Sequence, residues 1–311
     1  MPDLTLRPLP LPEFHLLLRR AKADGAHKCD RGPASRHFDG FFLERTEEAV
    51  RAFGSGIPPT RFQFYFIGLV ARSRATCTTG LASFHVEPRC ALFVPPEQIH
   101  SSRDWSTADR GYALSFSEAF VVGNLADKNI LRHPPLFQWD LPPFLRLAPA
   151  AGRRHPHAVR AARRPMGAAS PTLRHSAPPS PPAHRRAAGG IDLRVPQGGR
   201  AAGRKRPVYQ RFRAALEKQF RRKKRPSAYA AQLGAHPNHF ATAVRAASGL
   251  PPAEWIRARV VLEAQCLLAN TAQAVKKVAA ELGYDDVAYF SRLFKKSVGV
   301  SPRDYQLGAT T

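Results

Sequence analysis

The alternation of apolar and polar residues predicts short β-strands in the first part of the chain. In RFQFYFIGLV (61–70), three phenylalanines alternate with more polar positions, which is the period of a half-buried strand. RCALFVPP (89–96) predicts an apolar strand that ends at two prolines, and GYALSFS (111–117) predicts another. Short strands between turn residues are typical of a small antiparallel barrel or sandwich. Residues 1–140 are therefore expected to form a β-rich domain.

A different period governs the last third of the chain. In residues 207–311, apolar positions are spaced by three and four, which predicts amphipathic helices. AAQLGAHPNHFATAVRAASGLPPAEW (230–255) aligns with AAELGYDDVAYFSRLFKKSVGVSPRDY (279–305). The Ala-Ala-x-Leu-Gly start recurs after 49 residues, and Phe240 and Gly249 have counterparts after 50. Such a repeat predicts two copies of one structural unit.

Each copy is predicted to be a helix-turn-helix, at about 227–248 and 275–298. In the second copy, Gly283 permits the turn, and Asp286 is a suitable N-cap for the next helix. Small, aromatic and cationic side chains remain on the outer face, where they can reach base edges and phosphates in a major groove. One copy alone could equally be an ordinary helical hairpin with a solvated basic face, but the tandem repeat argues against that.

The stretch between the copies predicts one continuous helix over residues 252–270. Pro252 fits its first turn, and Ile256 and Val260 belong to its buried side. At 1.5 Å per residue, about 18 residues span roughly 27 Å. Recognition helices in successive major grooves lie about 34 Å apart. One chain could therefore read two adjacent grooves without dimerising.

The charge of the chain is distributed unevenly. Residues 1–140 carry 17 basic and 15 acidic side chains, residues 141–206 carry 14 and 1, and residues 207–311 carry 17 and 7, giving a net charge of +25. Only the back half is therefore expected to meet a polyanion, most simply nucleic acid.

Residues 141–206 are dominated by Arg, Ala, Pro, Gly and His, a composition that cannot build a core and predicts disorder. Three interpretations are open: a basic linker that follows DNA, a solvated segment without a specific role, or an out-of-frame segment. We favour the third, because a GC-rich gene translated out of frame yields such a sequence and two compensating frameshifts would preserve both flanks. Resequencing these codons tests it.

Cysteine spacing and hydropathy set expectations for the compartment. Cys29, Cys77, Cys90 and Cys266 show no CxxC spacing, which favours free thiols in a reducing compartment over disulfides or zinc. Apolar runs fall short of the roughly 18 residues that span a bilayer. The N-terminus lacks a signal-peptide core. We expect a soluble cytoplasmic protein with no membrane partner.

GYDDVAYFSRLFKKSVGVSPRDY (283–305) resembles the signature of the AraC/XylS family of bacterial transcription regulators: Gly-aromatic-x-x-x-x-Tyr-Phe-Ser-Arg-x-Phe-Lys-Lys, then Gly-x-Ser-Pro. The resemblance extends to RVVLEAQCLL (259–268) and to the weaker first copy. It implies two recognition helices in adjacent major grooves of double-stranded promoter DNA, with RNA polymerase as a partner if the protein is an activator. By position, the implied DNA contacts are Asn238, Ala241, Thr242, Arg245, Ala288, Tyr289, Arg292 and Lys295. His239 in the first copy and Lys296 on the outer face of the second are further candidate contacts.

The two sets of implied contacts differ in chemistry. The first copy has Ala241 and Thr242 where many relatives carry longer polar or basic groups, so its base readout is expected to be weaker. Asn238 could still pair with adenine, and Arg245 with guanine or phosphate. His239 is either a phosphate contact or an ordinary residue of the helix surface.

The front domain resembles, more loosely, the cupin-like effector domain of many family members. LFVPPEQIHSSRDW (92–105) and GYALSFSEAF (111–120) carry that resemblance. It implies a barrel that binds a small effector, for which His85, His100 and Tyr112 are the candidate contacts. It also implies helices that form a homodimer, and these would fall in the Arg/Pro-rich segment.

Two other functions are alternatives to a regulator. A metal-dependent cupin enzyme would use His85, Glu87 and His100, but the required His-x-His pair is missing. A non-specific nucleic-acid-binding protein would use the Arg/Pro-rich segment and RRKKRP (221–226), with steeply salt-dependent binding. The sequence favours an α+β protein with a β-rich cupin-like barrel, a basic low-complexity segment and an all-α tandem helix-turn-helix domain. We expect no enzymatic activity, cofactor or metal.

Overall fold

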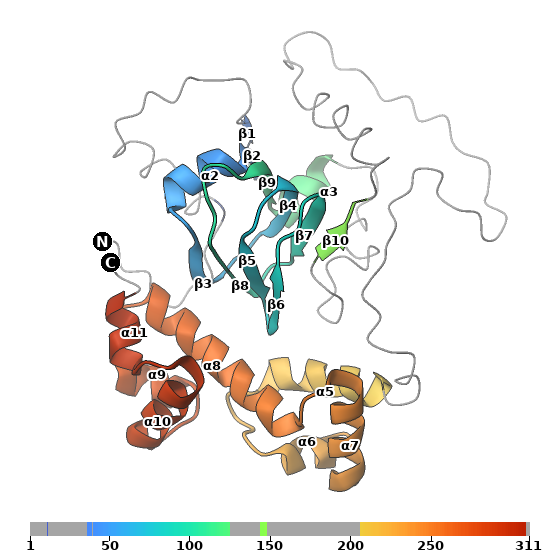
Figure 1. The fold of residues 1–311 in the computed structure, drawn as a ribbon. Coiled ribbons are helices and arrows are strands. Elements are labelled where there is room, and N and C mark those ends of the chain that lie inside the picture. The colour runs from blue at the N-terminus through green and yellow to red at the C-terminus, as the bar shows by residue number, and fades with distance from the viewer. Residues whose placement is uncertain (1–10, 12–35, 39, 125–143, 148–205, 309–311) are drawn as a thin grey trace, which may run out of the picture.

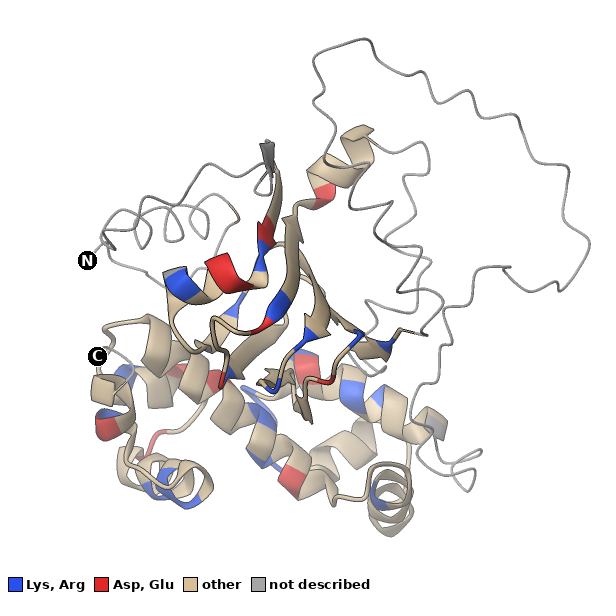
Figure 2. Cartoon of the chain, turned by 45° about the horizontal axis from the view of Figure 1, so that its top comes forward, with Lys and Arg blue, Asp and Glu red and all other residues tan. Residues whose placement is uncertain are grey.

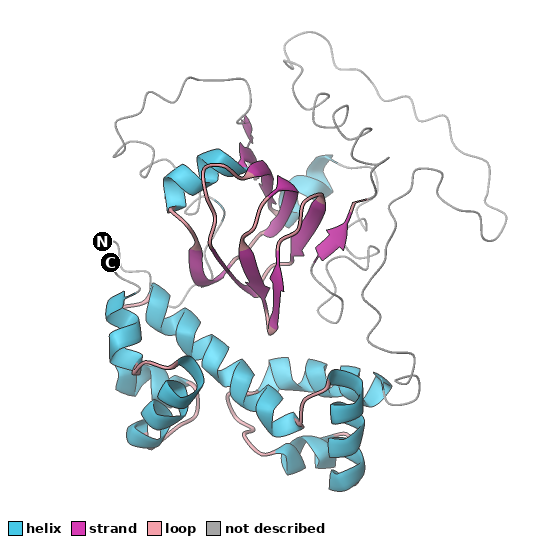
Figure 3. Cartoon of the chain, in the orientation of Figure 1, coloured by secondary structure: helices cyan, strands magenta, loops and turns pink. Residues whose placement is uncertain are grey.

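The computed structural model describes residues 11, 36–38, 40–124, 144–147 and 206–308. The described residues form a β-rich N-terminal region and a helical C-terminal region (Figures 1 and 3). This confirms the predicted fold class. Most of the Arg/Pro-rich segment, including everything from 148 to 205, lies outside the described residues.

The N-terminal region contains two antiparallel sheets, of order β1-β2-β9-β4-β7-β10 and β3-β8-β5-β6. Hydrogen bonds among the described strands join them into these two sheets and not into one closed barrel. Helix α2 follows β2, and α3 follows β9. The bounds are β1 Arg36–Phe38, β2 Phe41–Arg45, α2 Thr46–Phe53, β3 Ile57–Arg61, β4 Tyr65–Arg72, β5 Thr76–Thr79, β6 Ala82–His85, β7 Cys90–Val94, β8 Ile99–Arg103, β9 Arg110–Phe116, α3 Glu118–Asn124 and β10 Phe144–Arg146.

Three of these strands bear directly on the sequence predictions. β7 ends just before Pro95, as the two prolines predict, and β9 lies within the predicted stretch apart from its first residue. The predicted strand over 61–70 is wrong in its first half, because β3 ends at Arg61 and β4 begins at Tyr65. Phe62 and Phe64 lie in the bend between them, fully buried, with stacked rings 4.7 Å apart. Alternation identified buried side chains, but a bend can bury them as well as a strand can.

The C-terminal region consists of seven described helices. They are α5 Arg206–Gln219, α6 Pro226–Gln232, α7 Pro237–Ser248, α8 Pro252–Asn270, α9 Val275–Glu281, α10 Val287–Val298 and α11 Pro302–Gly308. α6 and α7 overlap the first predicted helix-turn-helix, and α9 and α10 overlap the second. Each pair packs against an end of the long helix α8 (Figure 1).

One hydrophobic cluster runs along α8 and joins both helical pairs. Phe240 of α7 and Phe290 of α10 are fully buried at equivalent places in it. Phe212 of α5 packs edge-to-face against Tyr229 and Phe240, with ring centroids 5.4 and 5.2 Å apart. Because burying one such side chain contributes about 1.5–3 kcal/mol, this shared cluster is the main source of stability for the helical region.

The free thiols of the described region are all buried. Burial raises the pKa of Cys77 and of Cys266 to about 12 and that of Cys90 to about 11. Cys29 lies outside the described residues.

Across the described parts of the chain, we find no helix with the length and apolar character that a bilayer crossing requires.

Candidate nucleic-acid interface and N-terminal cavity

Helix α10 is built to present one face outward. Asp286 caps its N-terminus, since the carboxylate oxygen Oδ1 accepts hydrogen bonds from the backbone N–H groups of Ala288 (2.8 Å) and Tyr289 (3.0 Å). Gly299 ends the helix in the left-handed conformation, at φ 94°. Phe290 faces the core. The predicted contacts on α10 are all exposed: Ala288, Tyr289, Arg292, Lys295 and Lys296.

Two of these exposed side chains have defined neighbours. Tyr289 is 51% exposed, and its ring stacks on that of Tyr284 at 6.0 Å and 27°. The Arg292 guanidinium lies 4.0 Å from the carboxylate of Asp286, in a pair that is mostly exposed. Such surface pairs contribute little stability, so the guanidinium can exchange this carboxylate for another anion.

Helix α7 has the same place in its pair but a different surface. It begins at Pro237, and its N-cap His236 makes no side-chain hydrogen bond to the helix. Asn238, His239, Thr242 and Arg245 are exposed, whereas Ala241 is partly buried. Figure 2 shows basic residues on α7 and α10, the helices at the two ends of the helical region, on its side away from the sheets. The arrangement can present two polar helix faces to one extended polyanion.

A cavity of about 80 Å³ lies between the two sheets and under α2. This is several times the roughly 15 Å³ that one buried water needs. Its lining is mostly apolar, with Phe42, Phe66, Leu92 and Trp105 among the contributors. Glu44, His100 and Tyr112 also line it. The cavity therefore suits a small, largely apolar molecule with few polar groups.

His100 and His85 occupy very different places. His100 is 3% exposed, and its Nδ1 lies 3.0 Å from the Thr79 hydroxyl. Burial lowers the pKa of His100 to about 4, so the ring is neutral at pH 7. His85 is exposed on β6, within 3.3 Å of the Thr76 hydroxyl, and is not part of the cavity lining. Of the three predicted effector contacts, the fold brings His100 and Tyr112 to the cavity and leaves His85 outside.

Sequence reasoning missed two features of this cavity. Glu44 is a buried carboxylate in β2, whose sequence is FFLER, and the charged residues Arg45 and Glu47 beside it made it look like part of an exposed stretch. Helix α2, which covers the cavity, was also missed, although acidic residues in its first turn and Gly54 after its end are helix signals. The three candidate metal ligands are not gathered here, because Glu87 pairs with Arg146 at 2.5 Å while His85 and His100 have the separate hydroxyl partners given above. Within the described residues, no group of three His, Cys, Asp or Glu could hold a metal ion.

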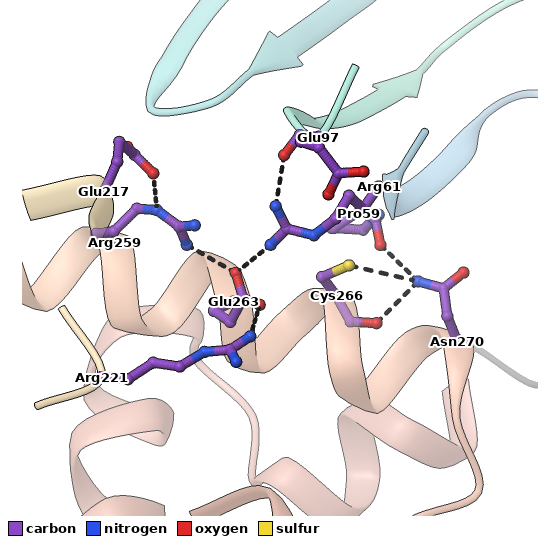
Figure 4. Close-up of polar contacts among 9 residues, drawn as sticks. All are labelled: Pro59, Arg61, Glu97, Glu217, Arg221, Arg259, Glu263, Cys266 and Asn270. Carbon is purple, nitrogen blue, oxygen red and sulfur yellow. Dashed lines mark hydrogen bonds and ion pairs between the residues drawn. The ribbon is translucent and has the colours of Figure 1, made fainter. Parts of the chain in front are cut away.

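The helical and sheet regions meet at α8 through a buried ion cluster (Figure 4). Glu263 of α8 is 2% exposed and accepts hydrogen bonds from Arg61 of β3 (2.5 Å) and Arg221 (2.7 Å). Arg259, on the same helix, donates to it at 2.9 Å. Burial alone would raise the pKa of Glu263, but Arg259 and Arg61 lower it to about 2. The carboxylate is therefore ionised and joins the two regions.

A second set of contacts lies about two turns further along α8, at Asn270. The Asn270 side-chain amide donates to the carbonyl of Pro59 (2.6 Å), and its oxygen accepts from the Thr60 hydroxyl (3.2 Å). Ile99 of β8 packs against Leu262 and Cys266 of the same helix. β3 and β8 thus contact the helix that carries both helical pairs, and the same two strands also line the cavity.

Comparisons with known proteins concern the helical region. Residues 229–307 match the family described as a helix-turn-helix domain. The arabinose operon regulatory protein of Salmonella typhimurium is 32% identical over 72 residues, covering 23% of this chain and 26% of that protein. The transcriptional activator RhaR of Yersinia pseudotuberculosis is 32% identical over 62 residues, covering 20% and 21%. The match thus spans about a quarter of the length of these curated relatives.

Among solved structures, the chain is similar to the DNA-binding domain of AdpA in complex with a target DNA. The identity is 25%, the coverage is 33% of this chain and 91% of that one, and the TM-score is 0.31. The C-terminal domain of AraT from Geobacillus stearothermophilus is 27% identical, with coverage of 33% and 85% and a TM-score of 0.32.

Proposed function

We propose that this protein is a sequence-specific transcription regulator, on the premise that its residues 229–307 form an AraC-type helix-turn-helix domain. The observation that supports this most directly is the capped helix α10, whose exposed Tyr289, Arg292 and Lys295 stand over a buried core. An arginine or lysine on such a face can pair with guanine or with phosphate.

The two helical pairs are proposed to read adjacent major grooves of promoter DNA. Helix α8 supports this, because one 19-residue helix packs against both pairs and separates α7 from α10. At 1.5 Å per residue it spans about 28 Å, which is close to one turn of DNA. A second chain is not needed for this geometry. Homodimerisation and contact with RNA polymerase remain predictions.

Selection of DNA duplexes from a random pool by the full chain tests this function. We expect a motif with two half-sites about one helical turn apart, bound in a way that survives moderate salt. A non-specific basic protein would enrich no motif, and its affinity would fall steeply with salt for every duplex. Arg292→Ala should weaken binding to the selected motif far more than to random duplex. An equal loss on both duplexes would exclude base readout by α10.

The N-terminal cavity is proposed to bind a small, mostly apolar effector that modulates DNA binding. His100 and Tyr112 would supply its polar contacts, since both line the cavity. β3 and β8 line the cavity and also contact α8. A ligand that shifts either strand would therefore act on the helix against which both helical pairs pack. His85, which lies outside the lining, is not expected to contact the effector.

A cavity-filling variant tests the effector site. Ser115→Trp places a large ring in the cavity, whereas Ser83→Trp places the same ring on the exposed strand β6. Wild-type protein and Ser83→Trp should show the same thermal stabilisation by hits from a panel of small apolar compounds, and Ser115→Trp should show none. Stabilisation that persists in Ser115→Trp would place the ligand elsewhere.

A further inference from the structure

We propose that Lys224 is a positioning residue that fixes the second recognition helix relative to the first. The proposal rests on the two-groove DNA reading proposed above. Lys224 lies in the turn 221–225 between α5 and α6, inside the basic run RRKKRP. The sequence alone predicts only a non-specific basic segment there. Its third and fourth members differ sharply in what they contact, and only one of them reaches the second helical pair.

The ammonium group of Lys224 joins backbone from both halves of the helical region. It donates to the carbonyls of Phe220 (2.6 Å) and Arg221 (3.0 Å), which precede the first pair. It also donates to the carbonyl of Leu282, the C-cap residue of α9 in the second pair. An ammonium has three N–H donors, and each of them therefore has an acceptor. Charge-assisted bonds of this kind are among the stronger hydrogen bonds in proteins.

The same ammonium lies over an aromatic ring that leads into α10. The Nζ atom is 4.8 Å from the centroid of the Tyr284 ring, a cation–π distance. Tyr284 stacks on Tyr289, the exposed candidate DNA contact, and lies 5.7 Å from the buried ring of Phe290. Lys224 thus contacts Tyr284, which in turn packs against the exposed Tyr289 and the buried Phe290 of α10.

The two pseudo-equivalent turns differ in what lies against them. Gly283 and Gly234 both adopt the left-handed conformation, at φ +74° and +64°. A Cβ on Gly283 would come within 2.2 Å of the Arg221 carbonyl, whereas one on Gly234 would meet no described atom within 4 Å. The second turn is therefore closed off by the 221–225 turn, and the first turn is open. Arg221 is itself held by Glu263 at 2.7 Å, which anchors the covering turn to α8.

The contact of Lys224 with Leu282 and Tyr284 limits how the second helical pair can move. α8 sets the separation of the two helical pairs, because both pack along it. A contact away from the α8 axis restricts the rotation of α9 and α10 about that axis. Two recognition helices fit adjacent grooves only when separation and rotational phase both match the DNA, which turns once in about 10.5 base pairs. Lys224 is therefore inferred to set the preference for half-site spacing.

The test compares Lys224→Met with Lys223→Met in the full-length protein. Both variants lose one positive charge from neighbouring positions, but Lys223 donates to Gln232 within the first pair and not to the second. The probes are the duplex selected by the wild-type protein, the same duplex with either half-site scrambled, and duplexes with two or five base pairs inserted between the half-sites.

We expect Lys224→Met to lose about tenfold or more in affinity for the intact duplex while keeping its affinity for each single half-site within about twofold. Its penalty for the insertions should shrink, because the phase is no longer fixed. Lys223→Met should retain the wild-type spacing preference. Unchanged spacing preference in Lys224→Met would overturn the inference, as would equal losses in the two variants, which would reduce the residue to its charge.

Two outcomes distinguish a failure of the role of Lys224 from a failure of the proposed DNA-binding function. If the wild-type protein selects no two-part motif, the proposed function fails. If the motif is found but Lys224→Met keeps the wild-type response to insertions, only the role of Lys224 fails. Should Lys224→Met not fold, Tyr284→Leu removes the ring beneath the ammonium and gives the same comparison, with the same expected loss of spacing preference.

Discussion

The two helical pairs share a backbone plan but differ in their surfaces and supports. α7 and α10 each have twelve residues, each ends at a left-handed glycine, and each buries an equivalent phenylalanine. α10 has a side-chain N-cap and carries Arg292, Lys295 and Lys296 on its outer face. The N-cap residue of α7 makes no side-chain hydrogen bond to the helix, and its exposed cationic side chain is Arg245. A repeated core thus determines where each helix lies, whereas the cap and the outer residues can differ between the two copies.

The largest expected effect concerns the core that the two pairs share. Phe240→Ala and Phe290→Ala each remove a fully buried ring, and such truncations typically cost about 3–5 kcal/mol. Because both rings belong to one cluster around α8, we expect similar losses in the free energy of unfolding, measured by chemical denaturation. A loss below about 1 kcal/mol for either variant would show that the two pairs are not supported by the same core.

The next effect separates the two outer faces. Arg292→Ala is expected to cost about 1–3 kcal/mol in affinity for the selected duplex, the usual contribution of a good base contact. Arg245→Ala should cost less, because α7 presents shorter neighbours such as Ala241 and Thr242. Titration of both variants against the same duplex measures the difference. A larger loss for Arg245→Ala would reverse the assignment of α10 as the stronger reader.

The N-caps provide a smaller effect that can be measured in both directions. Asp286→Ala removes the acceptor for the Ala288 and Tyr289 amides and should lower stability by about 1 kcal/mol. His236→Asp supplies the missing acceptor at the matching position of α7 and should raise stability by roughly 0.5–1 kcal/mol. Denaturation of each variant, read by circular dichroism, checks the pair. If His236→Asp is neutral or destabilising, the two N-termini are not equivalent.

Local signals explain which predictions succeeded. Helical periodicity, glycine turns and N-caps depend on residues that are only a few positions apart. The structure accordingly has the predicted Asp286 cap and a continuous α8 over 252–270. The strand predicted over 61–70 failed at Phe62 and Phe64 because alternation reports burial and not backbone direction. His85 looked equivalent to His100 in sequence, yet sheet pairing put one at an exposed edge and the other in the interior.

The helices of the C-terminal region, their repeat and the outward cationic face of α10 follow from local sequence, because periodicity and capping act within one or two helical turns. How these parts are joined depends on the tertiary packing. Arg61 meets Glu263 across 202 positions, and Lys224 meets Leu282 across 58. Nothing local links such residues, since their encounter depends on how whole sheets and helices pack. The same packing formed the cavity and placed one lysine of a basic run in contact with both halves of the helical region.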